Sequence, residues 1–143
     1  MTIARVLAAK QSTTVHTASP DMTVQEVVRI LAERRFGAVP VVEDGRVVGI
    51  ISERDLIYCA AREGGAALSR QVREVMTADP ITITPADAVL DALSLMTRKR
   101  VRHLPVVEQG TLTGFVSIGD LVKHRLDAVE AEAEAMRTYI QAG

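Results

Sequence analysis

Apolar and polar residues follow one another along this chain in an order that occurs twice. Residues 17–56, TASPDMTVQEVVRILAERRFGAVPVVEDGRVVGIISERDL, align without a gap with residues 82–121, TITPADAVLDALSLMTRKRVRHLPVVEQGTLTGFVSIGDL. The offset is 65 residues throughout, and 13 of the 40 aligned positions are identical. Repetition at a fixed period indicates two copies of one structural unit, the first and second repeats. Because a unit this short buries little apolar surface alone, we expect the two repeats to pack face to face.

Each repeat predicts the same order of elements. A short extended piece, 14–17 or 81–83, precedes a Ser-Pro or Thr-Pro turn and a helix whose apolar positions recur every three or four residues. Two β-rich runs follow, and the pair Asp44-Gly45 or Gln109-Gly110 between them predicts a hairpin. The Pro inside the first run argues against a central strand there. SERDL and SIGDL each open a second helix, so the sequence predicts an α/β fold of two β-α-β-β-α units.

The repeats divide the chain into two units, a linker and a C-terminal extension. We place the first unit at 1–63 (core 17–56, N-terminal helix 3–9), a linker with a flexible glycine pair and a short helix at 64–80, the second unit at 81–126, and a helical extension at 127–143.

The helix that ends the chain carries a long apolar stripe. Its members are Leu121, Val122, Leu126, Val129, Ala133, Met136 and Ile140. A stripe of this length predicts either a dimerisation surface or a lid over the other repeat.

Composition excludes several classes of protein. A net charge of −1 with 3% aromatic residues argues against a nucleic-acid partner, which needs a basic surface or stacking platforms. The single cysteine, Cys59, excludes an internal disulfide and a multi-thiolate zinc site, and its helical context favours a packed residue. The apolar runs are too short to span a membrane, and the first residues are too weakly apolar for a secretory signal. We therefore expect a cytoplasmic protein with no membrane partner.

The sharpest local motif is Ser-x-x-Asp, present as Ser52/Asp55 and Ser117/Asp120. A Ser at the start of a helix with an acid three residues later is a capping box, which stabilises a helix without any ligand. The same groups also suit a nucleotide. A helix N-terminus attracts phosphate, a hydroxyl donates to it, and a carboxylate accepts hydrogen bonds from a ribose diol.

A run of basic residues, 98–103, ends the first helix of the second repeat. Its first members suit a solvated helix C-terminus, where cations are favourable. Arg102 and His103 abut the strand HLPVV, so we expect them near Ser117 and Asp120 as phosphate contacts. The first repeat has Gly and Ala at the matching positions, and Arg54 is the basic residue available there. No nucleophile, base and orienting group come together, so we expect no catalytic activity.

The combined motifs resemble a known family. Two copies of P-V-V-x-x-G-x-x-x-G-h-h-S-x-x-D-L (h, apolar), joined by V-M-T-x-x-P-I-T at 75–82, look like a tandem CBS domain pair, a Bateman module. The resemblance covers about residues 3–126 and is closest to small stand-alone bacterial CBS proteins. It implies two units packed sheet to sheet about a pseudo-twofold axis, homodimers, and adenosine ligands in clefts between the units.

The resemblance also implies which residues contact a ligand. Asp55 and Asp120 would take ribose hydroxyls, and Ser52 and Ser117 would approach phosphate. The full implied set is Thr17, Val39, Pro40, Ser52, Arg54, Asp55, Thr82, Arg102, His103, Leu104, Pro105, Ser117 and Asp120. The ligand expected first is AMP, then ATP or ADP, NAD(H) or S-adenosylmethionine. With so few aromatic residues, we expect aliphatic walls rather than stacking to hold the adenine.

Two functions remain open at this point. One is a regulatory module that senses adenosine nucleotides and acts in trans on a separate effector protein. The other is a constitutive dimeric scaffold whose ligand clefts are vestigial. Stabilisation by an adenosine ligand distinguishes the two.

Overall fold

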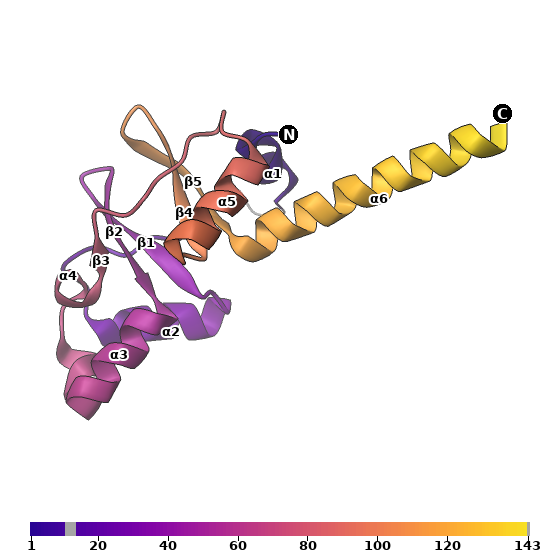
Figure 1. The fold of residues 1–143 in the computed structure, drawn as a ribbon. Coiled ribbons are helices and arrows are strands. Elements are labelled where there is room, and N and C mark those ends of the chain that lie inside the picture. Colours follow the sequence, from indigo (N-terminus) through magenta and orange to yellow (C-terminus); the bar gives the residue numbers. More distant parts are fainter. Residues whose placement is uncertain (11–13, 143) are drawn as a thin grey trace.

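The two repeats fold into the same helix, hairpin and helix that their sequences predict (Figure 1). The computed structural model describes residues 1–10 and 14–142. The first repeat forms α2 (Val24–Arg34), β1 (Ala38–Glu43), β2 (Arg46–Ser52) and α3 (Glu53–Glu63). The second forms α5 (Val89–Lys99), β4 (His103–Glu108), β5 (Thr111–Ser117) and α6 (Ile118–Ala142). The other elements are α1 (Ile3–Ala9), the 3-10 helix η1 (Gly64–Ser69), α4 (Val72–Val75) and β3 (Thr77–Ala78). The predicted α/β class is confirmed.

Both hairpins close through the two-residue turns that the sequence predicts. Asp44 and Gly45 have φ values of 52° and 78°, and Gln109 and Gly110 have 53° and 80°. Two successive positive φ values give the tight turn whose twist matches a β-hairpin, and glycine adopts the second of them without strain. The register of each hairpin is therefore set by local chemistry.

Pro40 lies in β1, at the edge of the three-stranded sheet β1-β2-β3, as its missing N–H predicts. β1 has β2 on one side and Ala18 on the other. The Ala18 N–H donates to the Pro40 carbonyl (2.9 Å), and the Val42 N–H donates to the Ala18 carbonyl (2.8 Å). Pairing on that side uses the proline oxygen and not its nitrogen, so the absent donor is not missed. Pro105 has the same place beside Ile83.

The extended pieces predicted at 14–17 and 81–83 are shorter than expected. Each pairs with its hairpin through a single parallel bridge, at Ala18 and Ile83. The chain then turns, because the Ser19 carbonyl accepts from the Met22 N–H (3.2 Å) and residues 84–87 make the same turn. Proline in each turn prevents the strand from continuing.

Each repeat is completed by the short helix that precedes the other repeat. Sequence order grouped α1 with the first unit, but Ile3 and Val6 belong to the core of the second repeat, and the Ile3 N–H donates to the Asp87 carbonyl (2.9 Å). α4 has the matching place on the first repeat, where the Val72 N–H donates to the Met22 carbonyl (2.8 Å). Both helices carry an apolar face, so only the packing decides which repeat each one covers.

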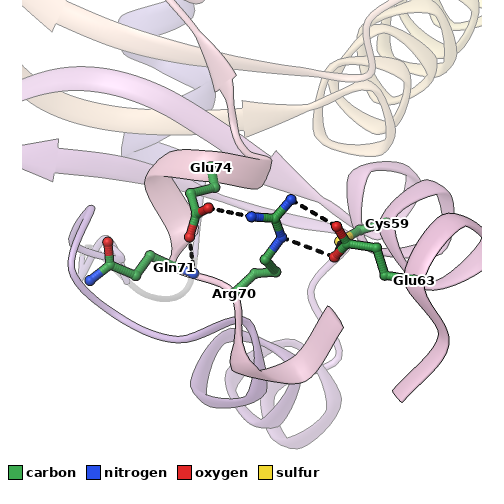
Figure 2. Close-up of polar contacts among 5 residues, drawn as sticks. All are labelled: Cys59, Glu63, Arg70, Gln71 and Glu74. Atoms are coloured by element: carbon green, nitrogen blue, oxygen red, sulfur yellow. Dashed lines mark hydrogen bonds and ion pairs between the residues drawn. The ribbon is translucent and has the colours of Figure 1, made fainter. Parts of the chain in front are cut away.

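The linker is ordered by its own contacts. Gly64–Ser69 forms a 3-10 helix rather than a flexible glycine pair, and β3 adds an antiparallel strand beside β2. Arg70 joins the end of α3 to α4, since it donates to both carboxylate oxygens of Glu63 (2.7 and 2.9 Å) and to Glu74 (Figure 2). Cys59 lies buried beside Glu63, and burial raises the pKa of its thiol, which fits the packed residue expected there.

The second repeat ends in a helix that extends far beyond the fold. β2 and β5 contact each other where the repeats meet, and α6 begins directly after β5 (Figure 1). Its first turns pack on α1 and α5, and the rest projects away from both repeats (Figure 1). α6 is therefore not a lid over the first repeat, and a dimerisation surface stays a prediction.

Candidate functional site

A cleft of about 630 Å³ opens between the two repeats. One wall comes from residues 14–16 and 34–39 of the first repeat. The other comes from β4, β5 and the first turn of α6, with Leu7 and Lys10 at one side. A volume of this size suits a small ligand such as a nucleotide. The second repeat's Ser-x-x-Asp motif therefore faces residues that lie far from it in the sequence.

Asp120 is the acidic side chain that lines this cleft. Its Oδ2 accepts from the Ser117 N–H (2.9 Å) and from the Lys10 ammonium (3.1 Å). Its other oxygen, Oδ1, accepts no hydrogen bond within the described part of the chain. Burial alone would raise the pKa of Asp120, but the Ser117 N–H and Lys10 outweigh it and hold the pKa below its ordinary value. At neutral pH Asp120 is therefore an anion with one oxygen to which no described residue donates.

Both Ser-x-x-Asp motifs form capping boxes. At α3 the Asp55 N–H donates to Ser52 Oγ (3.3 Å), and the Ser52 N–H donates to Asp55 Oδ2 (2.9 Å). At α6 the Asp120 N–H donates to Ser117 Oγ (3.1 Å), in the same reciprocal arrangement. The two motifs differ at Oδ1, because Thr77 donates its hydroxyl to Asp55 Oδ1 (3.2 Å). The carboxylate of the second repeat is the more available one.

His103 lies in the same cleft, stacked on Phe115 with ring centroids 5.6 Å apart and planes 11° apart. Burial lowers the pKa of His103, although Asp120 opposes that shift, so the ring is neutral at pH 7. The first repeat faces this ring with Gly37. A Cβ built on Gly37 would lie 3.2 Å from His103 Cε1. The loss of a side chain at this position of the first repeat therefore makes room for the second repeat's histidine.

The structure brings together only part of the predicted site set. Val39, His103, Ser117 and Asp120 line the cleft. The remaining nine do not line it: Thr17, Pro40, Ser52, Arg54, Asp55, Thr82, Arg102, Leu104 and Pro105. Among these, Thr17, Arg54, Thr82 and Arg102 are exposed, whereas Pro40, Leu104 and Pro105 are buried.

Arg102 is a correction to the predicted phosphate site. We expected it beside His103 and Asp120, but its side chain is exposed and lies outside the cleft. Arg102 lies at a bend immediately before β4, whereas His103 is the first residue of that strand. The Arg102 backbone carbonyl instead accepts from the Ile118 N–H (2.8 Å) at the start of α6.

The cations of the cleft come from elsewhere in the chain. Lys10 follows α1, and Arg34 and Arg35 end α2, at the positions that match Lys99 and Arg100 in the second repeat. In the sequence both helices, 24–34 and 89–99, end in basic residues. The sequence alone does not show which of these two ends faces Asp120. Packing about the pseudo-twofold places the end of α2 opposite the start of α6.

Aromatic rings also line the cleft, against the expectation of aliphatic walls. Both phenylalanines of the chain, Phe36 and Phe115, contribute to it, and His16 lies against Phe36 with centroids 5.4 Å apart. The number of aromatic residues in the chain does not show that two of them lie in one cleft. Their meeting depends on how the segment before β1 packs against β5.

Two further findings limit the chemistry of the fold. Within residues 1–10 and 14–142, no group of three or more His, Cys, Asp or Glu side chains is placed to hold a metal ion. In the same residues, no helix is long and apolar enough to cross a bilayer.

The sequence and the fold both match known proteins. The CBS domain model matches residues 10–62 and 72–127. The chain is 37% identical over 128 residues to the mitochondrial CBS domain-containing protein CBSX3 of Arabidopsis thaliana, of which it spans 62%, and 34% identical over 115 residues to YhcV of Bacillus subtilis, of which it spans 81%. A CBS-domain protein from Burkholderia ambifaria shares the fold with a TM-score of 0.83 and 34% identity over 89% of this chain and 95% of that one.

More distant structures share the fold alone. CBSX2, solved in complex with AMP, has a TM-score of 0.76 at 24% identity, over 89% of this chain and 97% of that one. The CBS domain pair of MJ0100, solved with 5′-methylthioadenosine and S-adenosylmethionine, has a TM-score of 0.76 at 23% identity. The two matched segments, the duplicated hairpin and helix, and relatives above 30% identity all agree: this chain belongs to the CBS-domain family, as a tandem pair.

Proposed function

We propose that this protein is a regulatory module that binds an adenosine nucleotide in the cleft between its repeats and acts in trans on a separate effector protein. The observation that carries the proposal is Asp120, an ionised carboxylate that lines a cleft together with Lys10, Arg34 and Arg35 and whose Oδ1 accepts no hydrogen bond from residues 1–10 and 14–142. An anion beside several cations suits a ligand with both a diol and a phosphate.

Each part of a nucleotide has a matching group in the cleft. The ribose diol would donate to Asp120 Oδ1, as vicinal hydroxyls do to acidic residues in dinucleotide folds. The Phe36 and Phe115 rings offer apolar faces for the base. Arginine and lysine side chains suit phosphate oxygens. The Lys10 ammonium lies in the cleft, where it donates to Asp120 and to the Phe115 carbonyl (2.9 Å). The CBSX2 complex with AMP and the MJ0100 complex with adenosyl ligands support this class of ligand.

A ligand in this position would couple the two repeats. Residues 34–39 belong to the first repeat, whereas His103, Ser117 and Asp120 belong to the second. One molecule bound in the cleft would therefore bridge the two repeats. Binding favours the arrangement of the repeats that contacts the ligand better. The difference in ligand affinity between two arrangements sets how far the equilibrium between them shifts. That shift is the signal that a separate protein would read.

A constitutive scaffold is the second candidate, and the capping boxes favour it. Ser52/Asp55 and Ser117/Asp120 each stabilise a helix start without a ligand. On this view the duplicated motif exists for folding, and the cleft is a remnant. The two candidates make opposite predictions about added nucleotide.

Thermal unfolding with AMP, ADP, ATP, NAD, S-adenosylmethionine and adenosine tests the proposal. At a hundredfold excess over Kd, a ligand of the native state adds about 2.7 kcal/mol to the free energy of unfolding. We expect AMP to raise the melting temperature more than adenosine, because only AMP reaches the cations. If none of the six compounds shifts the transition, the protein is a scaffold.

The affinity for AMP should rise as the pH falls from 8 to 6. In the free protein burial holds the pKa of His103 below its ordinary value, and a bound phosphate nearby would raise it. Between those two pKa values binding takes up a proton, so lower pH favours the complex. Calorimetry in buffers of different ionisation enthalpy measures the uptake. His103→Gln is the control, since the phosphate still titrates there; equal proton uptake in both proteins would contradict the role of His103.

A further inference from the structure

The apolar stripe of α6 has the spacing of a coiled coil. Its exposed part runs from Val122 to Ile140 in steps of four, three, four, three and four residues. Strict alternation of three and four is the heptad pattern, in which apolar residues occupy positions a and d. The a positions are Leu126, Ala133 and Ile140, and the d positions are Val122, Val129 and Met136.

The stripe faces away from the rest of the chain. Leu126 is 58% exposed, Met136 60% and Ile140 67%, and Figure 1 shows α6 projecting from the fold. The side of α6 that does pack on the fold is a different one, where Leu121 is buried and His124 approaches Met1. An apolar seam of this length on a projecting helix is stable in water only when another surface covers it.

Charges beside the seam complement a parallel copy of the same helix. In a parallel pair, position g of one helix lies beside position e of the next heptad of its partner. Arg125 at g would then meet the partner's Glu130 at e, and Glu132 at g would meet the partner's Arg137 at e. The two residues of each pair have opposite charges. Because the dimer is symmetric, each ion pair occurs twice.

An antiparallel pair over the same seam would be repulsive. In that arrangement e faces e and g faces g. Full overlap of the stripe would place Glu130 against the partner's Glu130, Glu132 against the partner's Glu132, and Lys123 against the partner's Arg137. Like charges at these positions act against pairing, so charge selects the direction of the helices.

We propose that α6 pairs in parallel and in register with the α6 of a second copy of this chain, in a two-stranded coiled coil. The a and d residues of Val122 to Ile140 form its seam, and Arg125, Glu130, Glu132 and Arg137 set its direction. The two nucleotide clefts of such a dimer lie at the same end of the coil, because both modules precede it in the chain.

Cysteine cross-linking of the full chain tests the direction. In a Cys59→Ala background, Val129→Cys and Met136→Cys should each form a disulfide-linked dimer on mild oxidation, since in register each d position faces itself. Glu134→Cys, on the outer side of the helix, is the matched control and should stay unlinked. An antiparallel coil brings position 129 near the partner's position 133 instead, so failure of both d-position variants to cross-link overturns the proposal.

Light scattering of the purified chain tests the seam and the charges. The wild type should be a dimer, and Val129→Glu with Met136→Glu should be a monomer that loses part of its far-ultraviolet helix signal, from the projecting part of α6, but keeps the thermal transition of the two repeats. Glu132→Arg should weaken the dimer roughly tenfold, and adding Arg137→Glu should restore it. A monomeric wild type overturns the proposal. So does a dimer that survives the double glutamate change, because it would then be held elsewhere, such as the apolar groove of about 590 Å³ between α2 and α3.

Discussion

Replacing Asp120 with alanine is expected to abolish stabilisation of the protein by AMP. The side chain supplies a carboxylate oxygen of the cleft, and a carboxylate that accepts two ribose hydroxyls contributes about 3 kcal/mol, or roughly a hundredfold in Kd. The apo protein should lose only a cap, about 1 kcal/mol, because the Ser117 N–H then lacks its acceptor. Isothermal titration with AMP and urea unfolding of the apo protein measure the two effects separately.

Two control variants separate ligand binding from helix capping. Asp120→Asn keeps an oxygen that accepts from the Ser117 N–H, so apo stability should be nearly unchanged while AMP binding still weakens at least tenfold. Asp55→Ala removes the same cap from α3, where Thr77 already occupies the second oxygen, so it should cost stability with little effect on AMP. A collapse of apo Asp120→Ala, together with no AMP binding by the wild type, would favour the scaffold. AMP binding retained in Asp120→Ala would instead show that Asp120 does not contact the ligand.

Gly49→Val is expected to destabilise the protein by about 3 kcal/mol, or roughly 10 °C in melting temperature. A Cβ at Gly49 would lie 2.5 Å from the Met76 sulfur and 2.9 Å from the Thr77 carbonyl oxygen. The sulfur can move with its side chain, but Thr77 belongs to β3, which pairs with β2 at this point. The linker strand must therefore separate from the sheet, and Met76 must leave the core.

Gly114 provides the matched comparison, since it has the equivalent position in the second repeat. The three atoms nearest to a Cβ there all belong to the Leu7 side chain, the first of them at 2.7 Å. Gly114→Val should therefore cost about 1–2 kcal/mol, less than Gly49→Val. Urea unfolding of the two variants gives the comparison. An equal loss, or a larger one at Gly114, would mean that β3 does not restrict the first sheet as described.

Features set by short-range chemistry were predictable from the sequence. The hairpin turns follow from Asp44-Gly45 and Gln109-Gly110, because few other residue pairs adopt two positive φ values readily. The capping boxes follow from Ser-x-x-Asp, which needs only one turn of helix. The edge position of Pro40 follows from its missing N–H, which is also a local property, whereas the single bridge that Ala18 makes to this edge depends on the tertiary fold.

The candidate site was predictable only in its second-repeat half. Ser117, Asp120 and His103 lie within one hairpin and the helix after it, so a motif was enough to find them. Lys10, Arg34 and Phe36 reach the same cleft from far along the chain. For Arg34 the sequence signal was its counterpart Lys99, which did not show which repeat faces which cleft. Lys10 and Phe36 correspond to Val75 and Val101, so the repeat gave no signal for them. Arg102 precedes His103 in the sequence, but it lies at a bend before β4 and its exposed side chain does not line the cleft.

The sequence by itself determined that this chain holds two copies of one unit, the order of elements in each, and the motifs that cap their helices. These are properties of short segments, since hydrogen bonds and side-chain periodicity act within a few residues. The tertiary structure alone decided that α1 covers the second repeat and α4 the first, and that the cations of one repeat face the carboxylate of the other. Those outcomes depend on how two similar apolar surfaces pack about a pseudo-twofold. The two units share one pattern of local signals, so the sequence does not show which elements of one unit face the cleft side of the other.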